Sequence, residues 1–265
     1  MHAIDPLLAE AAANLSGAAR LKADAQAELE ALGEAERKRV PGLPAVTSIV
    51  RVGPAAREIL ASARDSAAAL VVMGTQGLGG IRKMFFGSIA EKVLRGAAVP
   101  VLAVPLPESA TTGPKSARDS EAGVPDIRVV IASVELDASA EAVIGHAVSF
   151  ARGFGLPVML LHVVPPVDRM PRALEAARAA ERLHETNAQA RLAELADHLR
   201  GEVDVEVEIR SGSAAEEIAA AAAARRALAT IASGGENAHH RPGSIAYRVL
   251  CLSEAPVLAV PVRRL

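Results

Sequence analysis

The second half of the chain alternates short apolar runs with longer segments whose apolar residues recur at helical spacing. A short apolar run is typical of a buried strand, and apolar residues at every third or fourth position are typical of an amphipathic helix. The pattern predicts strands at residues 127–134, 158–163, 203–209, 227–232 and 257–260, and helices at residues 139–154, 172–199, 214–225 and 244–252. This alternation predicts an α/β fold with a parallel, doubly wound sheet.

Three segments of the first half recur in the second half in the same order. The repeated pairs are 49–59 with 208–218, 88–94 with 244–250, and 100–105 with 256–261, the last pair being identical Pro-Val-Leu-Ala-Val-Pro. Recurrence in the same order at nearly the same spacing, 159 or 156 residues here, is the signature of a repeated structural unit. We therefore predict two tandem copies of one fold.

The two copies are separated by a segment with a different composition. Residues 106–126 are rich in Ser, Thr, Gly, Pro and charged residues and show no apolar period, which is typical of a linker. The predicted organisation is a first domain at residues 1–105, a linker at 106–126 and a second domain at 127–265.

The first copy lacks the beginning of the repeated unit. His2 aligns with His162, so Met1 falls on Leu161, inside the second strand of the second copy. The first strand, the first helix and most of the second strand therefore have no counterpart. Two interpretations follow: the natural chain starts further upstream by a strand–helix unit, or the shortened copy borrows strands from a partner or exposes sheet edges.

Glycines gather where the predicted strand at residues 70–73 ends. From Val71 to Ser88 the chain passes from a valine-rich run through closely spaced glycines to Gly87 and Ser88, which open a helical pattern. Glycine allows backbone N–H groups to approach a ligand, and a helix start offers unpaired N–H groups and the positive end of its dipole. The stretch predicts a phosphate-binding loop; a flexible loop that binds nothing is the alternative.

The spacing Gly74-x-x-Gly77, then nine residues, then Gly87-Ser88, resembles the nucleotide-binding signature of the universal stress protein family. The strand before it, the helix after it and the last strand fit the family in order. The resemblance implies a strand order of 3-2-1-4-5, with ATP, alone or with Mg²⁺, at the carboxyl ends of the strands. It implies nucleotide contacts in the first copy from Met73, Gly74, Gly77, Gly87, Ser88 and Ile89.

Two further features of the first copy bear on this site. Arg82 lies within the loop and could add positive charge beside a triphosphate, although a solvated loop cation fits equally well. The family places an Asp at the end of its first strand, and the first copy has no such position. In the implied order the absent strands lie between those at 46–52 and 70–73, so we expect the sheet of the first copy to be split.

The second copy shows the opposite pattern, with an intact first strand and an altered glycine loop. Its candidate nucleotide contacts are Glu135, in place of the Asp of the family, Asp137, Gly235, Gly243 and Ser244. Ala232 aligns with the first glycine, and an alanine is strained where φ is positive. Glu236 also brings negative charge toward a phosphate. We expect this copy to bind ATP poorly or not at all.

The identical segments at residues 100–105 and 256–261 are both apolar last strands. In the family such strands pair antiparallel across a two-fold axis, between chains or between tandem copies. The resemblance therefore implies a pseudo-dimer within one chain, and a homodimer through the last strands.

Composition limits the classes of partner. The chain has 51% hydrophobic residues, only 2% aromatic residues and a net charge of −2. Without a basic stripe or aromatic rings for base stacking, we expect no nucleic-acid partner. A single cysteine excludes an intramolecular disulfide framework, and no segment has the apolar length of a membrane span, so we expect a cytoplasmic protein with no membrane contact.

Candidate chemistry outside the glycine loops is weak. The pair His239-His240 near Glu236 is more simply exposed than metal-bound, and His162 at a strand end is more simply a hydrogen-bonded structural residue. No catalytic residues are identified, since no nucleophile or acid–base constellation stands out.

The chain is therefore expected to be a universal stress protein that binds ATP and acts in the stress response, with at most slow ATP hydrolysis. The stress role is implied by the resemblance alone. Two alternatives are a nucleotide-free dimerisation scaffold with degenerate sites and an enzyme of the wider adenine-nucleotide α/β group.

Overall fold

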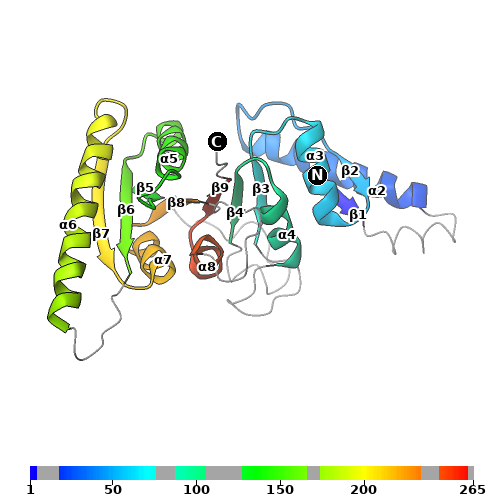
Figure 1. Ribbon diagram of the computed structural model, residues 1–265. Helices are drawn as coiled ribbons and strands as arrows, with labels where there is room; N and C mark the ends of the chain where they lie inside the picture. Colours follow the sequence, from blue (N-terminus) through cyan, green and yellow to red (C-terminus); the bar gives the residue numbers. More distant parts are fainter. Residues whose placement is uncertain (5–17, 76–86, 106–126, 166–173, 234–244, 262–265) are drawn as a thin grey trace. The chain divides into compact units, whose positions relative to one another are not determined.

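The computed structural model describes residues 1–4, 18–75, 87–105, 127–165, 174–233 and 245–261 (Figure 1). Their contacts form two compact units that divide between Ala68 and Ala69. This division falls inside the expected first domain at residues 1–105. The boundaries of that domain, of the 106–126 linker and of the 127–265 domain stay predictions.

The first unit, Met1–Ala68, holds a small parallel sheet and two helices. Its elements are β1 (His2–Ile4), α2 (Ala18–Arg39), β2 (Val50–Val52) and α3 (Ala55–Asp65), and β1 pairs with β2. Arg51 of β2 lies 3.7 Å from Glu58 and 2.6 Å from Asp65 in side-chain N···O distance. These ion pairs tie the strand to the first and last turns of α3.

The second unit, Ala69–Leu265, is built on a seven-stranded sheet in the order β3-β4-β9-β8-β5-β6-β7. The strands are β3 (Val71–Gly74), β4 (Val101–Val104), β5 (Val129–Ser133), β6 (Val158–Val164), β7 (Val205–Ser211), β8 (Ala227–Ser233) and β9 (Val257–Val260). All neighbouring strands are parallel except β4 and β9. Within the second copy this gives the order 3-2-1-4-5, so the expected α/β fold is confirmed.

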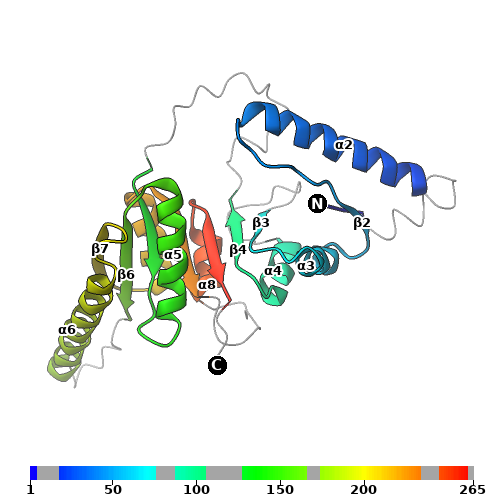
Figure 2. The ribbon, with the colours of Figure 1, turned by 90° about the horizontal axis from the view of Figure 1, so that it is seen from above.

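Helices cover both faces of the second copy's part of the sheet (Figures 1 and 2). The helices of this unit are α4 (Ser88–Gly96), α5 (Ala140–Phe154), α6 (Leu174–His198), α7 (Ala214–Ala224) and α8 (Ile245–Leu252). Val143 of α5 and Leu192 of α6 share one buried cluster with Leu160 and Ile231 of the sheet. Every residue of β5 is buried, because a central parallel strand is covered on both faces.

The strands of the first copy lie in two separate sheets. β1 corresponds to β6, since His2 pairs with Val50 and His162 pairs with Ile209, at equivalent positions of β2 and β7. β1 and β2 form the two-stranded sheet, whereas β3 and β4 join the seven-stranded sheet. The expected split of the first copy's sheet is confirmed for the described residues.

β4 and β9 join the two copies by antiparallel pairing. The partners are Val101 with Ala259, Leu102 with Leu258, and Ala103 with Val257. Because these strands are repeats of each other, the pairing is self-complementary about Leu102 and Leu258, as it is across a two-fold axis.

The expected antiparallel pairing of the last strands is thus present within the chain. Each of these strands also has a second neighbour, β3 beside β4 and β8 beside β9. Both edges of each strand are therefore paired within this sheet, and the expected homodimer through the last strands stays a prediction.

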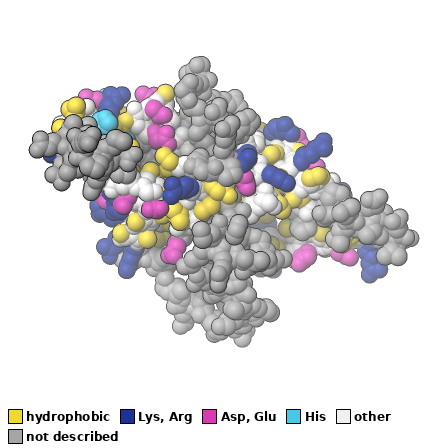
Figure 3. Space-filling model, turned by 60° about the horizontal axis from the view of Figure 1, so that its bottom comes forward, with side chains coloured by type: hydrophobic (Ala, Val, Ile, Leu, Met, Phe, Trp, Pro, Cys, Tyr) yellow, Lys and Arg dark blue, Asp and Glu magenta, His cyan; other side chains and the backbone are white. Residues whose placement is uncertain are grey.

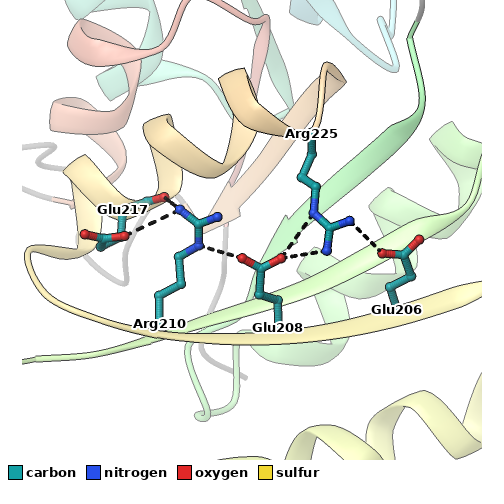
Figure 4. A network of polar contacts seen from close by, with 5 residues as sticks. All are labelled: Glu206, Glu208, Arg210, Glu217 and Arg225. Carbon is teal, nitrogen blue, oxygen red and sulfur yellow. Dashed lines mark hydrogen bonds and ion pairs between the residues drawn. The ribbon is translucent and has the colours of Figure 1, made fainter.

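Strand β7 lies at one edge of the sheet and carries charged residues bound to α7 and its cap (Figure 4). The Glu208 carboxylate accepts hydrogen bonds from Arg210 Nε at 2.6 Å and Arg225 Nη2 at 2.9 Å. Arg225 also lies 3.3 Å from Glu206, and Arg210 lies 3.5 Å from Glu217. Charged residues on an edge strand oppose pairing with a further strand.

The pKa of Glu208 reflects this network. Burial raises it, but the hydrogen bonds from Arg225 and Arg210, with their positive charges, lower it more, so the net pKa lies below the usual value of 4.5. The ionised carboxylate is therefore favoured by folding.

Glu208→Gln should lower the free energy of unfolding near neutral pH by about 1 kcal/mol, because both arginines lose a charged acceptor. The wild-type contribution is present above the usual pKa and is lost as the pH falls through the lowered folded-state pKa. Urea unfolding from about pH 5 to about pH 3 should therefore show a steeper loss of stability in the wild type than in the variant.

The matched control for this test is Glu206→Gln, which removes a single contact of 3.3 Å on the same strand. Glu206→Gln should change the pH dependence of the unfolding free energy less than Glu208→Gln does. If the free energy of unfolding falls equally with pH in the wild type and in Glu208→Gln, the ionised Glu208 carboxylate does not stabilise the fold.

The surface carries both signs of charge. Acidic and basic side chains are interspersed on the face drawn in Figure 3, in keeping with the net charge of −2. Among the described residues, no helix combines the length and apolar character needed to cross a bilayer.

Candidate functional site

The candidate site of the first copy begins at the end of β3. Met73 is half-buried in this strand, and Gly74, the last strand residue, is exposed. Thr75 follows and is buried, and its N–H donates to the Val104 carbonyl at 3.1 Å. The end of β3 is thereby fixed to the end of β4.

Gly87 lies against this strand end, although eleven residues separate it from Thr75 in the chain. The Gly87 N–H donates to the Thr75 carbonyl at 2.8 Å, and a Cβ on Gly87 would lie only 3.1 Å from that oxygen. A larger residue would therefore push the two backbones apart. This contact places the start of α4 beside the end of β3.

Gly87 is also the N-cap of α4, and the Glu91 N–H donates to its carbonyl at 2.9 Å. The preceding N–H groups of the first turn have no acceptor within the helix and point out of its amino end. Ser88 and Ile89 are exposed there. Glu91 is ion-paired with Arg95, which offsets its negative charge, so the helix start remains suited to an anion.

The structure therefore brings Gly74, Gly87, Ser88 and Ile89 to one strand–helix junction. Gly77 and Arg82 lie outside the described residues, and their place at this junction stays a prediction. Thr75 was not identified from the sequence, although its position directly after the apolar run was the available signal.

In the second copy, the Asp137 side chain is hydrogen-bonded to Ser139, the N-cap residue of helix α5. Its Oδ1 accepts the Ser139 N–H at 2.8 Å and the Ser139 hydroxyl at 2.6 Å, while its own N–H donates to the Glu135 carbonyl at 2.8 Å. Glu135 is exposed. Asp137 is one of the candidate nucleotide contacts of the second copy, and its Oδ1 atom is already occupied by these two hydrogen bonds from Ser139.

Asp137→Ala should lower the free energy of unfolding by about 1 kcal/mol, because the N–H and hydroxyl of Ser139 lose their acceptor. Asp137→Asn retains an amide oxygen at the same place and should lose less. Thermal unfolding of the three proteins measures this, and an alanine variant as stable as the wild type would contradict a stabilising role for the bonds to Ser139.

His162 links the ends of β5 and β6. Its Nδ1 lies 2.8 Å from the Val134 carbonyl, and because a carbonyl only accepts, Nδ1 carries the proton and donates. The Val134 N–H in turn donates to the Leu161 carbonyl at 2.9 Å. The expected role of His162 as a hydrogen-bonded structural residue is confirmed.

The two glycine loops align differently from the sequence expectation. Gly74 pairs with Val104 in β4, and Ser233 pairs with Val260, the repeat of that valine, in β9. Ser233 therefore occupies the position of Gly74, and the predicted match of Ala232 is wrong by one residue. Gly235, Gly243 and Ser244 lie outside the described residues.

Two serines that the sequence did not single out end the central strands of the second copy. Ser133 ends β5 and Ser233 ends β8, and both are buried. They lie at the switch point of the sheet, where ligands bind in doubly wound folds. The signal in the sequence was a polar residue that closes an apolar run.

The structure does not bring the candidates of the two copies together. Because β4 and β9 are antiparallel, the carboxyl ends of β3 and β4 lie at the opposite end of the sheet from those of β5 to β9. Four inter-strand spacings, roughly 19 Å, also separate β3 from β5. Each copy must therefore bind a ligand by itself.

Metal ligands do not gather in the described part of the chain, where no group of three or more His, Cys, Asp or Glu side chains could hold an ion. His239 and His240 lie outside it.

Comparison with known proteins gives a consistent result. The chain matches the universal stress protein family over residues 1–105 and 127–261. A universal stress protein from Thermus aquaticus is 40% identical over 70 residues, which are 26% of this chain and 51% of that protein. One from Methanocaldococcus jannaschii is 43% identical over 56 residues, 21% of this chain and 33% of that protein.

These matches span about half or less of the length of the curated relatives. Among solved structures, a universal stress protein from Archaeoglobus fulgidus superposes with a TM-score of 0.65 at 18% identity. That match covers 91% of this chain and 79% of the other. At this identity the likeness supports the fold.

Proposed function

The chain belongs to the universal stress protein family, and on that premise we propose that it is an ATP-binding regulatory protein of the stress response. The binding site is the loop of the first copy between β3 and α4. The observation that carries this proposal is the 2.8 Å hydrogen bond from Gly87 to Thr75, which sets an open helix start against a strand end. The glycine-rich spacing lies between these two residues.

In the proposed complex, backbone groups carry most of the recognition. Gly74 and Gly77 lie near the ribose and phosphates. The helix start at Gly87 and Ser88 binds the phosphates through the Ser88 N–H, since the Gly87 N–H is donated to the Thr75 carbonyl. Met73 and Ile89 supply apolar contacts, and Arg82 adds a positive charge. A charged group in place of Gly87 would fill the space beside Thr75 and repel the phosphates.

The second copy is proposed to bind ATP weakly or not at all. Ser233 adds a side chain where the first copy has Gly74, and Asp137 is bound to the start of α5. Its proposed role is to hold the first copy's β3 and β4, through β9, in a cytoplasmic pseudo-dimer. The protein would then act by changing between nucleotide-bound and nucleotide-free states and by associating with partners, and it would not act by catalysis.

A nucleotide-free scaffold is the second candidate. It is favoured by the pairing of β4 with β9 and by Ser233, which stands in the second copy where the first has Gly74. The two proposals differ in whether the chain responds to ATP.

Calorimetric titration of the whole chain with ATP separates them. Gly87→Glu should weaken ATP binding by at least about a hundredfold, by steric exclusion and like charge. Gly87→Ala should weaken it less, because its Cβ would meet the Thr75 carbonyl at 3.1 Å without adding charge.

The matched control is Gly243→Glu, the same change at the repeated position of the second copy, which should leave the affinity near that of the wild type. Equal losses in both Glu variants would place the site elsewhere. No ATP binding by the wild type would favour the scaffold.

A further inference from the structure

Helices α4 and α8 are repeats of each other and lie on one face of the seven-stranded sheet. Each connects two parallel strands, β3 to β4 and β8 to β9, and such crossovers are right-handed. Because β4 and β9 are antiparallel, two right-handed crossovers place their helices on the same face, pointing in opposite directions. The start of α4 therefore lies toward the end of α8.

Equivalent positions of the two helices carry different pairs of side chains. In α4, the Arg95 guanidinium donates a hydrogen bond to the Glu91 carboxylate, one turn away. In α8, the same positions hold Tyr247 and Cys251, which are also hydrogen-bonded to each other. The first copy thus has two charged groups where the second copy has a phenol and a thiol.

The two pairs meet at the contact between the copies. The pKa of Tyr247 lies above its usual value of 10.0, first because of burial, and then because of Cys251 and the negative charge of Glu91. The positive charge of Arg95 acts in the opposite direction. Tyr247 is therefore neutral near pH 7, and it lies close enough to α4 to interact with both of these charges.

The ion pair of α4 is partly buried at this contact. The side chains of Glu91 and Arg95 are only 26% and 34% exposed. In the ion pair of the same spacing between Glu34 and Lys38 in α2, the side chains are 55% and 76% exposed. Partly buried charges are screened less by water and salt, so Glu91 is held on Arg95 more firmly than in an exposed pair.

The direction in which Glu91 extends matters for the start of α4. Ser88 and Glu91 are three residues apart, so they are neighbours on one helix face. Helix side chains lean toward the amino end of the helix, so a Glu91 carboxylate without a partner would extend toward Ser88 and the proposed phosphates. Arg95 lies one turn in the other direction and holds the carboxylate away from the helix start.

We propose that Tyr247 of the second copy is a positioning residue for the nucleotide site of the first copy. Its ring covers the Glu91–Arg95 pair and keeps the Glu91 carboxylate on Arg95, at a distance from the bound phosphates. The inference rests on the proposed ATP site, to which it adds a residue of the other copy. The second copy, although a poor binder itself, thereby controls the charge that an anionic ligand meets.

The test is calorimetric titration of the whole chain with ATP at low salt. Tyr247→Ala should weaken binding by about fivefold, because water weakens the ion pair and the Glu91 carboxylate can approach the phosphates. Tyr247→Phe keeps the ring and should bind like the wild type. The matched control is Arg248→Ala, which removes a side chain bonded to Ser213 and Glu216 at the start of α7 and should leave the affinity unchanged.

Removing the carboxylate separates positioning from a general loosening of the fold. In a Glu91→Gln background, Tyr247→Ala should change the ATP affinity by less than about twofold, because no carboxylate remains to be held. Arg95→Gln should weaken binding at least as much as Tyr247→Ala, and adding Glu91→Gln should restore most of the affinity. The loss caused by Tyr247→Ala should also be smaller for AMP, which carries less charge than ATP, and smaller at high salt.

Two results would overturn this inference while leaving the ATP site in place. They are a Tyr247→Ala variant that binds ATP like the wild type, and a loss of affinity that persists in the Glu91→Gln background. No ATP binding by the wild type would instead overturn the proposed function, and this inference with it. Circular dichroism establishes that each variant is folded, and Tyr247→Leu, which fills more of the space, serves where Tyr247→Ala does not fold.

Discussion

The arrangement of the larger unit depends on the antiparallel pairing of β4 with β9. Two isolated strands are marginally stable in water, so β3 and β4 need a further partner. β9 provides it, and Leu102 packs against the buried cluster of the second copy. Val101 and Ala103 are buried on the other face. The strand end that anchors the candidate loop is therefore stabilised by a core belonging mainly to the other copy.

Much of this arrangement could be predicted from periodicity and repetition. The apolar run at residues 127–134 and the helical pattern after it predicted the buried strand β5 and its helix, because both carry strong local signals. The identical last strands indicated a self-complementary contact, and the family resemblance supplied its direction. The alignment of His2 with His162 was enough to predict that the first copy's sheet would be split.

Other features could not be read from local pattern. An apolar strand carries no marker of its register, so the match of Ala232 rather than Ser233 to Gly74 was off by one residue. Asp137 looks the same in the sequence whether its carboxylate binds a ligand or Ser139, and only the 2.6 Å contact with the Ser139 hydroxyl distinguishes the two. The network around Glu208 joins residues 17 positions apart, because a strand and the end of the following helix meet in space.

The opposite directions of the two copies have a consequence for how such a chain can change. The β3 and β8 strands end at opposite ends of the sheet, so a substitution beyond one strand end imposes no steric demand at the other. Mutations could accumulate in the second copy's loop while the first keeps its glycine spacing, provided that the β4–β9 contact and the α5 core survive. Duplication in this geometry separates the residues that hold the fold from those free to specialise.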